Sequence, residues 1–202
     1  MSDEIQFIIS GKSNIKHESI VKAVINDLTR SEESSSLVKT DKHFKREETE
    51  RLKVIVKTTN LWISDIDFDN YVSEGAEQKV YLKNGKSVIK LNDAIYYISW
   101  IDYLHNLLLH NYFFPDTAYQ LLGFFENNSV LFAVVEQPYV KATVKTELSA
   151  VRHFMEDNGF KNIRNNDYLN FDLGLIIEDL HDENVLTQNG VLYFIDTVFY
   201  II

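Results

Sequence analysis

Two Asn-Gly dipeptides constrain the fold of this sequence most strongly. Asn84-Gly85 joins the β-rich runs "KVYLK" and "SVIKL", and Asn189-Gly190 precedes the apolar run "VLYFID". Asn-Gly suits a tight hairpin turn, because both central residues of that turn take positive φ angles. The sequence therefore predicts antiparallel sheet in two places, with "FDNYVSEG" as a further strand of the first.

The remaining segments alternate between helical and extended patterns. Residues 1–60 read as an N-terminal strand/helix appendage, with a strand at Ile5–Ile9. Apolar residues at helical spacing predict helices at about residues 15–28, 41–59, 93–110 and 145–160. Gly159 is expected to end the last of these helices. Residues 129–137 are expected to form a strand that ends before Pro138, because proline cannot donate to a ladder.

Composition excludes several classes of function. The chain has no cysteine, so disulfides, thiolate zinc sites and cysteine nucleophiles are impossible, and a reducing cytoplasm is the expected location. A net charge of -10 argues against nucleic acid as a partner. No apolar run approaches ~18 residues, so we expect no membrane partner. After Arg164 there are acids but no Lys or Arg, which favours hard divalent cations near this segment.

Two patterns resemble ligand sites but fail on spacing. "FIISGKS" has Gly-Lys-Ser, yet the first glycine of a phosphate-binding loop would fall at Gln6. His105 and His110 are five residues apart, which places them on different faces of a helix, and we expect packing or surface roles for both.

The segment "EDLHDENVL", residues 178–186, carries the strongest chemical signal. Phosphoryl transfer needs an anchor for nucleotide phosphates, metal ligands, and a carboxylate that orients the attacking hydroxyl. Asp179 can face a substrate while Asn184 turns toward Asp196, at the end of an apolar strand, to share a metal. The alternative is that Asp179 and Asn184 cap turns and the other acids are solvated.

Upstream residues supply the remaining parts. Gly75 lies in a turn between the first two strands, and Lys90 lies in the apolar run "VIKL". An unpaired ammonium is costly there, so Lys90 is expected to bind an anion; the alternative is an edge-strand lysine.

Taken in their order along the chain, these features resemble those of the protein kinase-like family. "DLHDENVL" matches the catalytic-loop pattern D-L-K-P-E-N-[IV]-L, "VIKL" matches the lysine strand, and "YFID" stands where the metal-binding Asp belongs. More narrowly, "GAEQKVYLKNGKSVIKLND", "VVEQPYV" and "LGLIIEDLHDENVL" resemble the serine/threonine/tyrosine kinase-like domain of polyvalent proteins from phages and bacterial mobile elements. The resemblance covers about Trp62 to Val198.

The resemblance implies an ATP- and Mg²⁺-dependent phosphotransferase acting on a protein hydroxyl. Lys90 would contact the α- and β-phosphates, and Asp179 would orient the acceptor. Asn184 and Asp196 would hold Mg²⁺. The Gly75-Ala76 turn would cover the phosphates. The backbone of Glu136–Val140, including Glu136 and Tyr139, would contact adenine. Leu82 or Val80 would pack on the purine ring.

The resemblance also implies an α+β, protein kinase-like fold with a small antiparallel sheet lobe and a reduced helical lobe, which bind ATP between them. We expect the appendage at residues 1–60, the sheet lobe with one helix at 61–135, and the hinge and reduced helical lobe at 136–202. Only six residues follow Asp196, so the expected fold is truncated after the metal-binding Asp, without a platform for peptides.

Several positions depart from the family pattern. One glycine, Gly75, stands where kinases have three, and His181-Asp182 replaces Lys-Pro. No helix glutamate matches, so Asp102 is the best substitute as partner of Lys90. Thr197 follows Asp196 in place of Phe-Gly, and the apolar end "TVFYII" is expected to pack on the core or on a partner.

These departures leave two other hypotheses open. One is a pseudokinase-like module that binds nucleotide or other domains of a larger polyprotein without phosphoryl transfer. The other is a small-molecule kinase.

Overall fold

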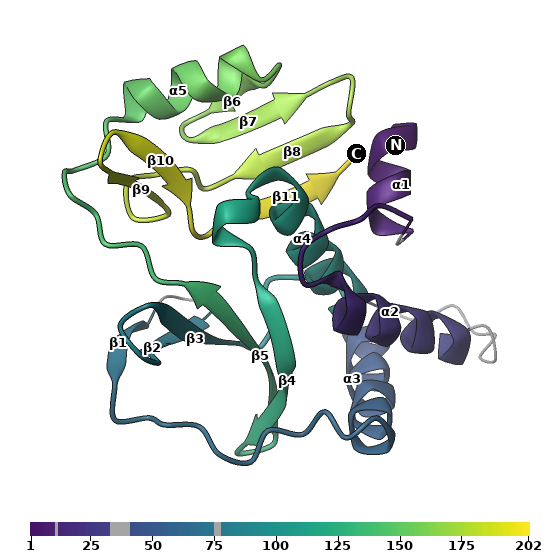
Figure 1. Ribbon diagram of the computed structural model, residues 1–202. Coiled ribbons are helices and arrows are strands. Elements are labelled where there is room, and N and C mark those ends of the chain that lie inside the picture. The colour runs from purple at the N-terminus through teal and green to yellow at the C-terminus, as the bar shows by residue number, and fades with distance from the viewer. Residues whose placement is uncertain (11, 33–40, 75–77) are drawn as a thin grey trace. The chain divides into compact units, whose positions relative to one another are not determined.

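The computed structural model describes residues 1–10, 12–32, 41–74 and 78–202 of a mixed α+β chain. The chain divides into two compact units. Unit 1 comprises Met1–Lys16, Leu108–Ala118 and Val140–Ile202, and unit 2 comprises His17–Leu107 and Tyr119–Tyr139. Each unit has antiparallel sheet of its own (Figure 1).

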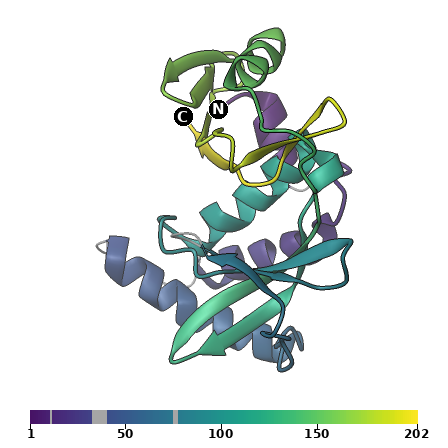
Figure 2. The same cartoon turned by 90° about the vertical axis from the view of Figure 1, so that its left-hand side faces the viewer.

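Unit 2 is built on a five-stranded antiparallel sheet in the order β1-β2-β3-β5-β4. Its strands are β1 (Tyr71–Glu74), β2 (Gln78–Leu82), β3 (Ser87–Asn92), β4 (Gln120–Asn127) and β5 (Val130–Pro138). Helix α2 (Glu18–Glu32) lies beside α3 (Asp41–Thr58) and also contacts β4 (Figures 1 and 2). The predicted pairing of the first three strands is confirmed.

One face of this sheet carries an apolar cluster. Tyr81, Leu91 and Val134 are buried there. Six partly buried residues pack against them, namely Ile63, Ile66, Ile89, Leu122, Phe125 and Phe132. Because side chains alternate along a strand, the neighbouring residues of β2 and β3, among them Lys90, point to the opposite face.

The segment after α3 runs parallel to β4 at very close range, with a β-bridge between Trp62 and Phe124. The N–H of Phe124 donates to the carbonyl of Leu61, and the N–H of Ile63 donates to the carbonyl of Phe124, both at 2.8 Å. A Cβ atom on Gly123 would lie 2.2 Å from the Leu61 oxygen. Only glycine lets the two backbones approach this closely.

Helix α3 also holds the start of α4 (Trp100–Phe113), whose residues from Leu108 onward belong to unit 1. The Glu48 carboxylate is fully buried and accepts the N–H groups of Trp100, at 2.6 Å, and Ile101, at 3.2 Å. Lys45 donates to the carbonyls of Ala94 and Tyr97. Two α3 side chains therefore satisfy backbone groups at the entry to α4.

Unit 1 contains α1 (Asp3–Ile9), the end of α4, the 3₁₀ turn η1 (Pro115–Thr117) and α5 (Leu148–Asp157). Its four-stranded sheet has the order β11-β8-β7-β6. The strands are β6 (Lys161–Arg164), β7 (Asp167–Asn170), β8 (Leu175–Glu178) and β11 (Val198–Ile201), while β9 (Val185–Gln188) and β10 (Val191–Phe194) form a separate hairpin. Pairing of β11 with β8 returns the apolar end of the chain to the core of unit 1.

The strand prediction at Ile5–Ile9 is wrong, because these residues lie in helix α1. Ile5 and Ile8 are buried at helical spacing, and the Ser2 hydroxyl caps the helix by accepting from the Ile5 N–H at 3.3 Å. Asp3 and Glu4 in the first turn complement the helix dipole.

The prediction of a helix at 93–110 places its start too early. The side chains of Asn92 and Asp93 accept the N–H groups of Ala94 and Ile95, and Ala94 has φ 55°. These turns keep the segment out of the helix until Ser99, whose hydroxyl accepts from the Asp102 N–H at 3.0 Å.

The two Asn-Gly turns differ from each other. Asn189 and Gly190 have φ 51° and 81° and join β9 directly to β10, as predicted for a two-residue hairpin turn. At the first site only Gly85 has positive φ, and the Asn84 side chain instead accepts the N–H of Ser87 at 3.2 Å. The expectation of two positive φ angles is therefore wrong there, although the hairpin exists.

The region after the predicted hinge contains more strand than helix. From Val140 to Ile202, α5 accompanies six short strands. Gly159, with φ 80°, follows α5 as predicted. None of the helices in the described part of the chain combines the length and apolar character needed to span a bilayer.

Candidate active site

The acidic loop predicted to carry catalysis joins β8 to β9 in unit 1. The N–H of His181 donates to the carbonyl of Asp179 at 2.9 Å, and the N–H of Asn184 donates to that of His181 at 3.0 Å. The Asn184 side-chain Nδ2 donates to the Asp179 carbonyl at 2.9 Å and to its carboxylate at 3.2 Å. Asn184 thus holds both the backbone and the side chain of Asp179.

Asp179 adopts a left-handed conformation that is unusual for a residue with a side chain. Its φ is 68°. The buried Asp167 of β7 accepts the Asp179 N–H at 3.2 Å, and Arg164 contacts the other Asp167 oxygen at 3.2 Å. These contacts fix the backbone while leaving the Asp179 side chain 60% exposed, so a ligand can reach the carboxylate.

Asp196 is attached to the same loop through the backbone. It follows β10, and the N–H groups of Ile195 and Asp196 both donate to the Asn184 carbonyl, at 2.9 and 3.3 Å. Unit 1 therefore brings together the three predicted residues Asp179, Asn184 and Asp196.

The charges around the loop are mostly negative. Burial, and then the neighbouring Asp167 carboxylate, raise the pKa of Glu178; Arg164 opposes this shift, and Asp179 adds to it. The exposed Lys145 ammonium contacts Asp182 at 3.1 Å. His181 Nε2 lies 3.3 Å from the Asp179 carboxylate. The position that the family pattern gives to lysine thus holds a group that is cationic only when protonated.

The donor set fits Mg²⁺ bound together with a phosphate. Among the described residues, no three His, Asp or Glu side chains are grouped as potential metal ligands. Mg²⁺, however, usually takes one or two protein oxygens and completes its shell with substrate phosphates and water. Asn184 commits its nitrogen to Asp179, so its amide oxygen is the end that a cation can use.

Lys90 lies in unit 2, in the central strand β3, and is 3% exposed. Its alternative reading as an edge-strand lysine is therefore wrong. The ammonium lies 5.3 Å from the centre of the Tyr119 ring, within range of a cation–π interaction.

The strand register places the predicted purine contacts beside Lys90. Val80 is directly opposite Lys90, and Leu82 is opposite Val88. Directly opposed residues share a face, so Val80, Leu82, Val88 and Lys90 lie on the sheet face opposite the Tyr81 cluster.

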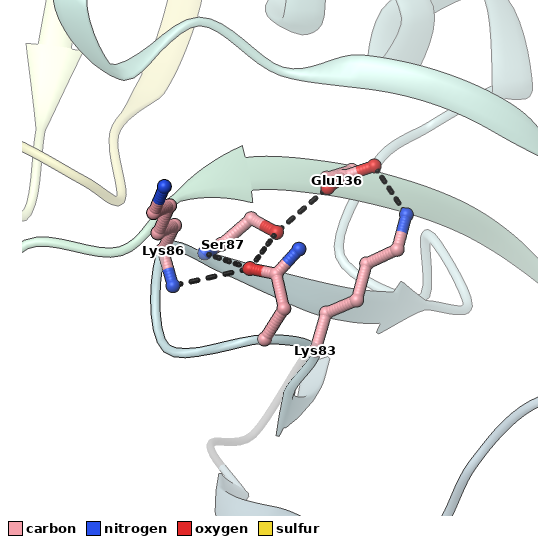
Figure 3. Close-up of polar contacts among 5 residues, drawn as sticks. Lys83, Lys86, Ser87 and Glu136 are labelled. Carbon is pink, nitrogen blue, oxygen red and sulfur yellow. Dashed lines mark hydrogen bonds and ion pairs between the residues drawn. The ribbon is translucent and has the colours of Figure 1, made fainter.

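The predicted hinge begins at the end of β5. The Glu136 side chain accepts from Lys83 Nζ at 2.8 Å and from the Ser87 hydroxyl at 2.7 Å (Figure 3). Burial acts to raise the pKa of Glu136, but the hydrogen bonds from Lys83 and Ser87 outweigh it and lower the pKa. The Tyr139 N–H donates to the Lys86 carbonyl at 2.8 Å. The Glu136 side chain is thus occupied within the sheet, and an adenine contact would have to use backbone groups.

Two predicted nucleotide-binding residues, Gly75 and Ala76, lie outside the described residues. Asp102, the predicted substitute for the helix glutamate, is in the first turn of α4 and is exposed. Its pairing with Lys90 stays a prediction.

Sequence reasoning missed the residues that support the loop. Asp167 and Arg164 hold the Asp179 backbone from 12 and 15 positions away, and no spacing rule links them to it. The only signal was that no Lys or Arg follows Arg164 in the chain.

Comparison with known proteins places this site in a family. None of the curated proteins matches the sequence. The sequence model described as a serine/threonine/tyrosine kinase found in polyvalent proteins matches residues 45–202, which include the whole acidic loop, Asp196 and Lys90. The chain therefore belongs to the family of serine/threonine/tyrosine kinases found in polyvalent proteins.

Proposed function

We propose that this chain transfers the γ-phosphoryl group of ATP, in a Mg²⁺-dependent reaction, to a hydroxyl group of a protein. Family membership supports a kinase-like function, and the description of the family names hydroxyl-bearing side chains. The observation that carries the proposal is the hydrogen-bonded linkage of Asp179, Asn184 and Asp196 through Asn184.

In this proposal the residues in and around the acidic loop have separate roles. Asp179 accepts a hydrogen bond from the acceptor hydroxyl and orients its oxygen toward the γ-phosphorus, for which an exposed carboxylate is suited. Asn184 and Asp196 would hold Mg²⁺, which, when bound, offsets the charge of the phosphate oxygens. Asp167 and Arg164 keep the Asp179 backbone in its left-handed conformation.

Lys90 is proposed to anchor the α- and β-phosphates. The family match supports this role, because it includes the strand that carries Lys90, and Lys90 lies directly opposite Val80 on the same sheet face. Val80 and Leu82, on the same face, are proposed to contact the purine, with the backbone of Glu136–Val140 at the adenine edge.

Turnover of γ-labelled ATP, with mixed cellular protein as acceptor, tests this function. Asp179→Asn should lower labelling of acceptor about a hundredfold or more, the usual loss when a positioned base is removed. The matched control is Asp182→Asn, which changes an acid of the same loop that pairs with surface Lys145 and should keep near wild-type labelling.

A binding measurement completes the experiment. Mg-ATP should raise the melting temperature of the wild type and of Asp179→Asn, and should do so less for Lys90→Ala and Asp196→Asn. Equal labelling by wild type and Asp179→Asn would refute the proposed role of Asp179. A thermal shift without labelling by the wild type would instead indicate a nucleotide-binding module.

A further inference from the structure

His110 is fully buried near the end of α4 and has no part in the proposed chemistry. Its Nδ1 lies 2.7 Å from the Thr197 hydroxyl, and its Nε2 lies 3.0 Å from the Thr117 carbonyl. Thr117 and Thr197 are each 1% exposed. The ring therefore joins η1 to the residue that immediately follows Asp196.

The direction of these hydrogen bonds follows from their chemistry. A carbonyl can only accept, so Nε2 of His110 must carry a proton and donate to Thr117. In the neutral ring Nδ1 is then an acceptor, and the Thr197 hydroxyl donates to it. The Thr117 hydroxyl donates in turn to the carbonyl of Phe194 at 2.5 Å.

This chain of hydrogen bonds reaches a residue on each side of Asp196, namely the backbone carbonyl of Phe194 and the side-chain hydroxyl of Thr197. Phe194 lies two residues before it and Thr197 one residue after it. The Phe194 ring also stacks on Phe114, with ring centres 4.2 Å apart. Between these anchors, the N–H groups of Ile195 and Asp196 donate to Asn184.

We propose that His110, acting through Thr197 and Thr117, is a positioning residue that fixes the backbone on both sides of Asp196. This inference rests on the proposed function, because it concerns Asp196 as a metal ligand. A hydroxyl at position 197, where the family pattern has Phe, lets a buried imidazole hold the loop by hydrogen bonding.

The cleanest test replaces Thr197 with valine, which keeps the shape and removes the hydroxyl. Thr197→Ser restores the hydroxyl and serves as the rescue, and His110→Leu breaks the network at its centre. The matched control is Thr146→Val, because Thr146 is 4% exposed and shares a 2.9 Å hydrogen bond with the Thr187 hydroxyl, outside this network.

Hydrogen–deuterium exchange of a peptide spanning residues 194–198 reports the backbone directly, since the Ile195 and Asp196 amides are donors there. Thr197→Val and His110→Leu should exchange at least about tenfold faster than wild type, while Thr197→Ser and Thr146→Val should not. Unchanged exchange in both Thr197→Val and His110→Leu would overturn the proposal, whether or not the chain is a kinase.

Binding of Mn²⁺ with a nonhydrolysable ATP analogue, followed by the paramagnetic signal of free Mn²⁺, reports the metal. Thr197→Val should weaken Mn²⁺ binding about tenfold, as loss of a residue supporting a ligand commonly does, and Thr197→Ser should restore it. An equal loss in Thr146→Val would show that the effect is only general destabilisation and would refute the positioning role. If the wild type binds no Mn²⁺, the proposed function fails and the exchange result alone decides the positioning role.

Discussion

Replacing Glu48 with alanine should destabilise unit 2 far more than the loss of a surface acid would. The fully buried carboxylate accepts two N–H groups, from Trp100 and Ile101, at the start of α4. Each N–H is one that the helix cannot satisfy internally. Alanine would leave both without this acceptor, and a buried unsatisfied donor costs about 1–3 kcal/mol.

The expected loss in the free energy of unfolding is therefore about 2–5 kcal/mol for Glu48→Ala. Glu48→Gln keeps one acceptor oxygen and should lose roughly half as much. The control is Glu50→Ala on the same helix. The Glu50 side chain is 69% exposed and lies 3.6 Å from Lys53, so its loss should cost less than about 0.5 kcal/mol.

Urea unfolding followed by tryptophan fluorescence measures this change. The chain has two tryptophans, Trp62 and Trp100, and both belong to unit 2. Trp100 is 1% exposed and donates from its indole to the Thr49 hydroxyl of α3, so its emission should shift when α3 separates from α4. With a slope of about 2 kcal/mol per M, the midpoint for Glu48→Ala should fall by about 1–2.5 M. A loss no larger than that of Glu50→Ala would refute the reasoning that Glu48 caps α4.

Two further predictions concern the unit 2 sheet. Gly123→Ala should destabilise unit 2 by about 1–3 kcal/mol, because the new Cβ would meet the Leu61 oxygen at 2.2 Å. Gly85 has φ 71°, but a Cβ atom there would have no atom within 4 Å, so Gly85→Ala should lower the free energy of unfolding by only about 1 kcal/mol. Equal urea midpoints for Gly123→Ala and Gly85→Ala would contradict the steric argument. The lowered folded-state pKa of Glu136 means that this residue contributes stability above its ordinary pKa of 4.5, and Lys83→Met should remove the part of it that comes from Lys83. That contribution is lost as pH falls through the lowered pKa, so the urea midpoints of wild type and Lys83→Met should converge on acidification. A difference in urea midpoint that does not depend on pH would count against the ion pair.

The two hairpins could be predicted because they depend on local chemistry. Asn189-Gly190 turned as expected because both residues take positive φ and two residues suffice to join β9 and β10. Asn184 was expected to turn toward Asp196, and its main-chain carbonyl does accept the Asp196 N–H, but its side-chain amide donates to Asp179, a contact that was not predicted.

The misread elements had competing local signals. A short apolar run such as Ile8-Ile9 fits strand or helix, and the Ser2 cap followed by two acids was the signal that decided for the helix. At the start of α4, side chains of Asn92 and Asp93 captured backbone N–H groups before the helix could use them.

Partners distant in sequence could not be predicted. His110 and Thr197 are 87 positions apart, and Glu48 is 52 from Trp100. Only the packing of whole elements brings such residues together, and one sequence contains no record of that packing.

The two attachments of Asn184 affect how substitutions at that position would be read. Its side chain restrains Asp179, whereas its main-chain oxygen restrains Ile195 and Asp196. A replacement side chain changes the first attachment and keeps the second, because every amino acid retains a main-chain oxygen. A defect in an Asn184 variant would thus combine loss of the proposed metal ligand with release of the Asp179 carboxylate, while the hydrogen bonds from Ile195 and Asp196 to position 184 stay in place.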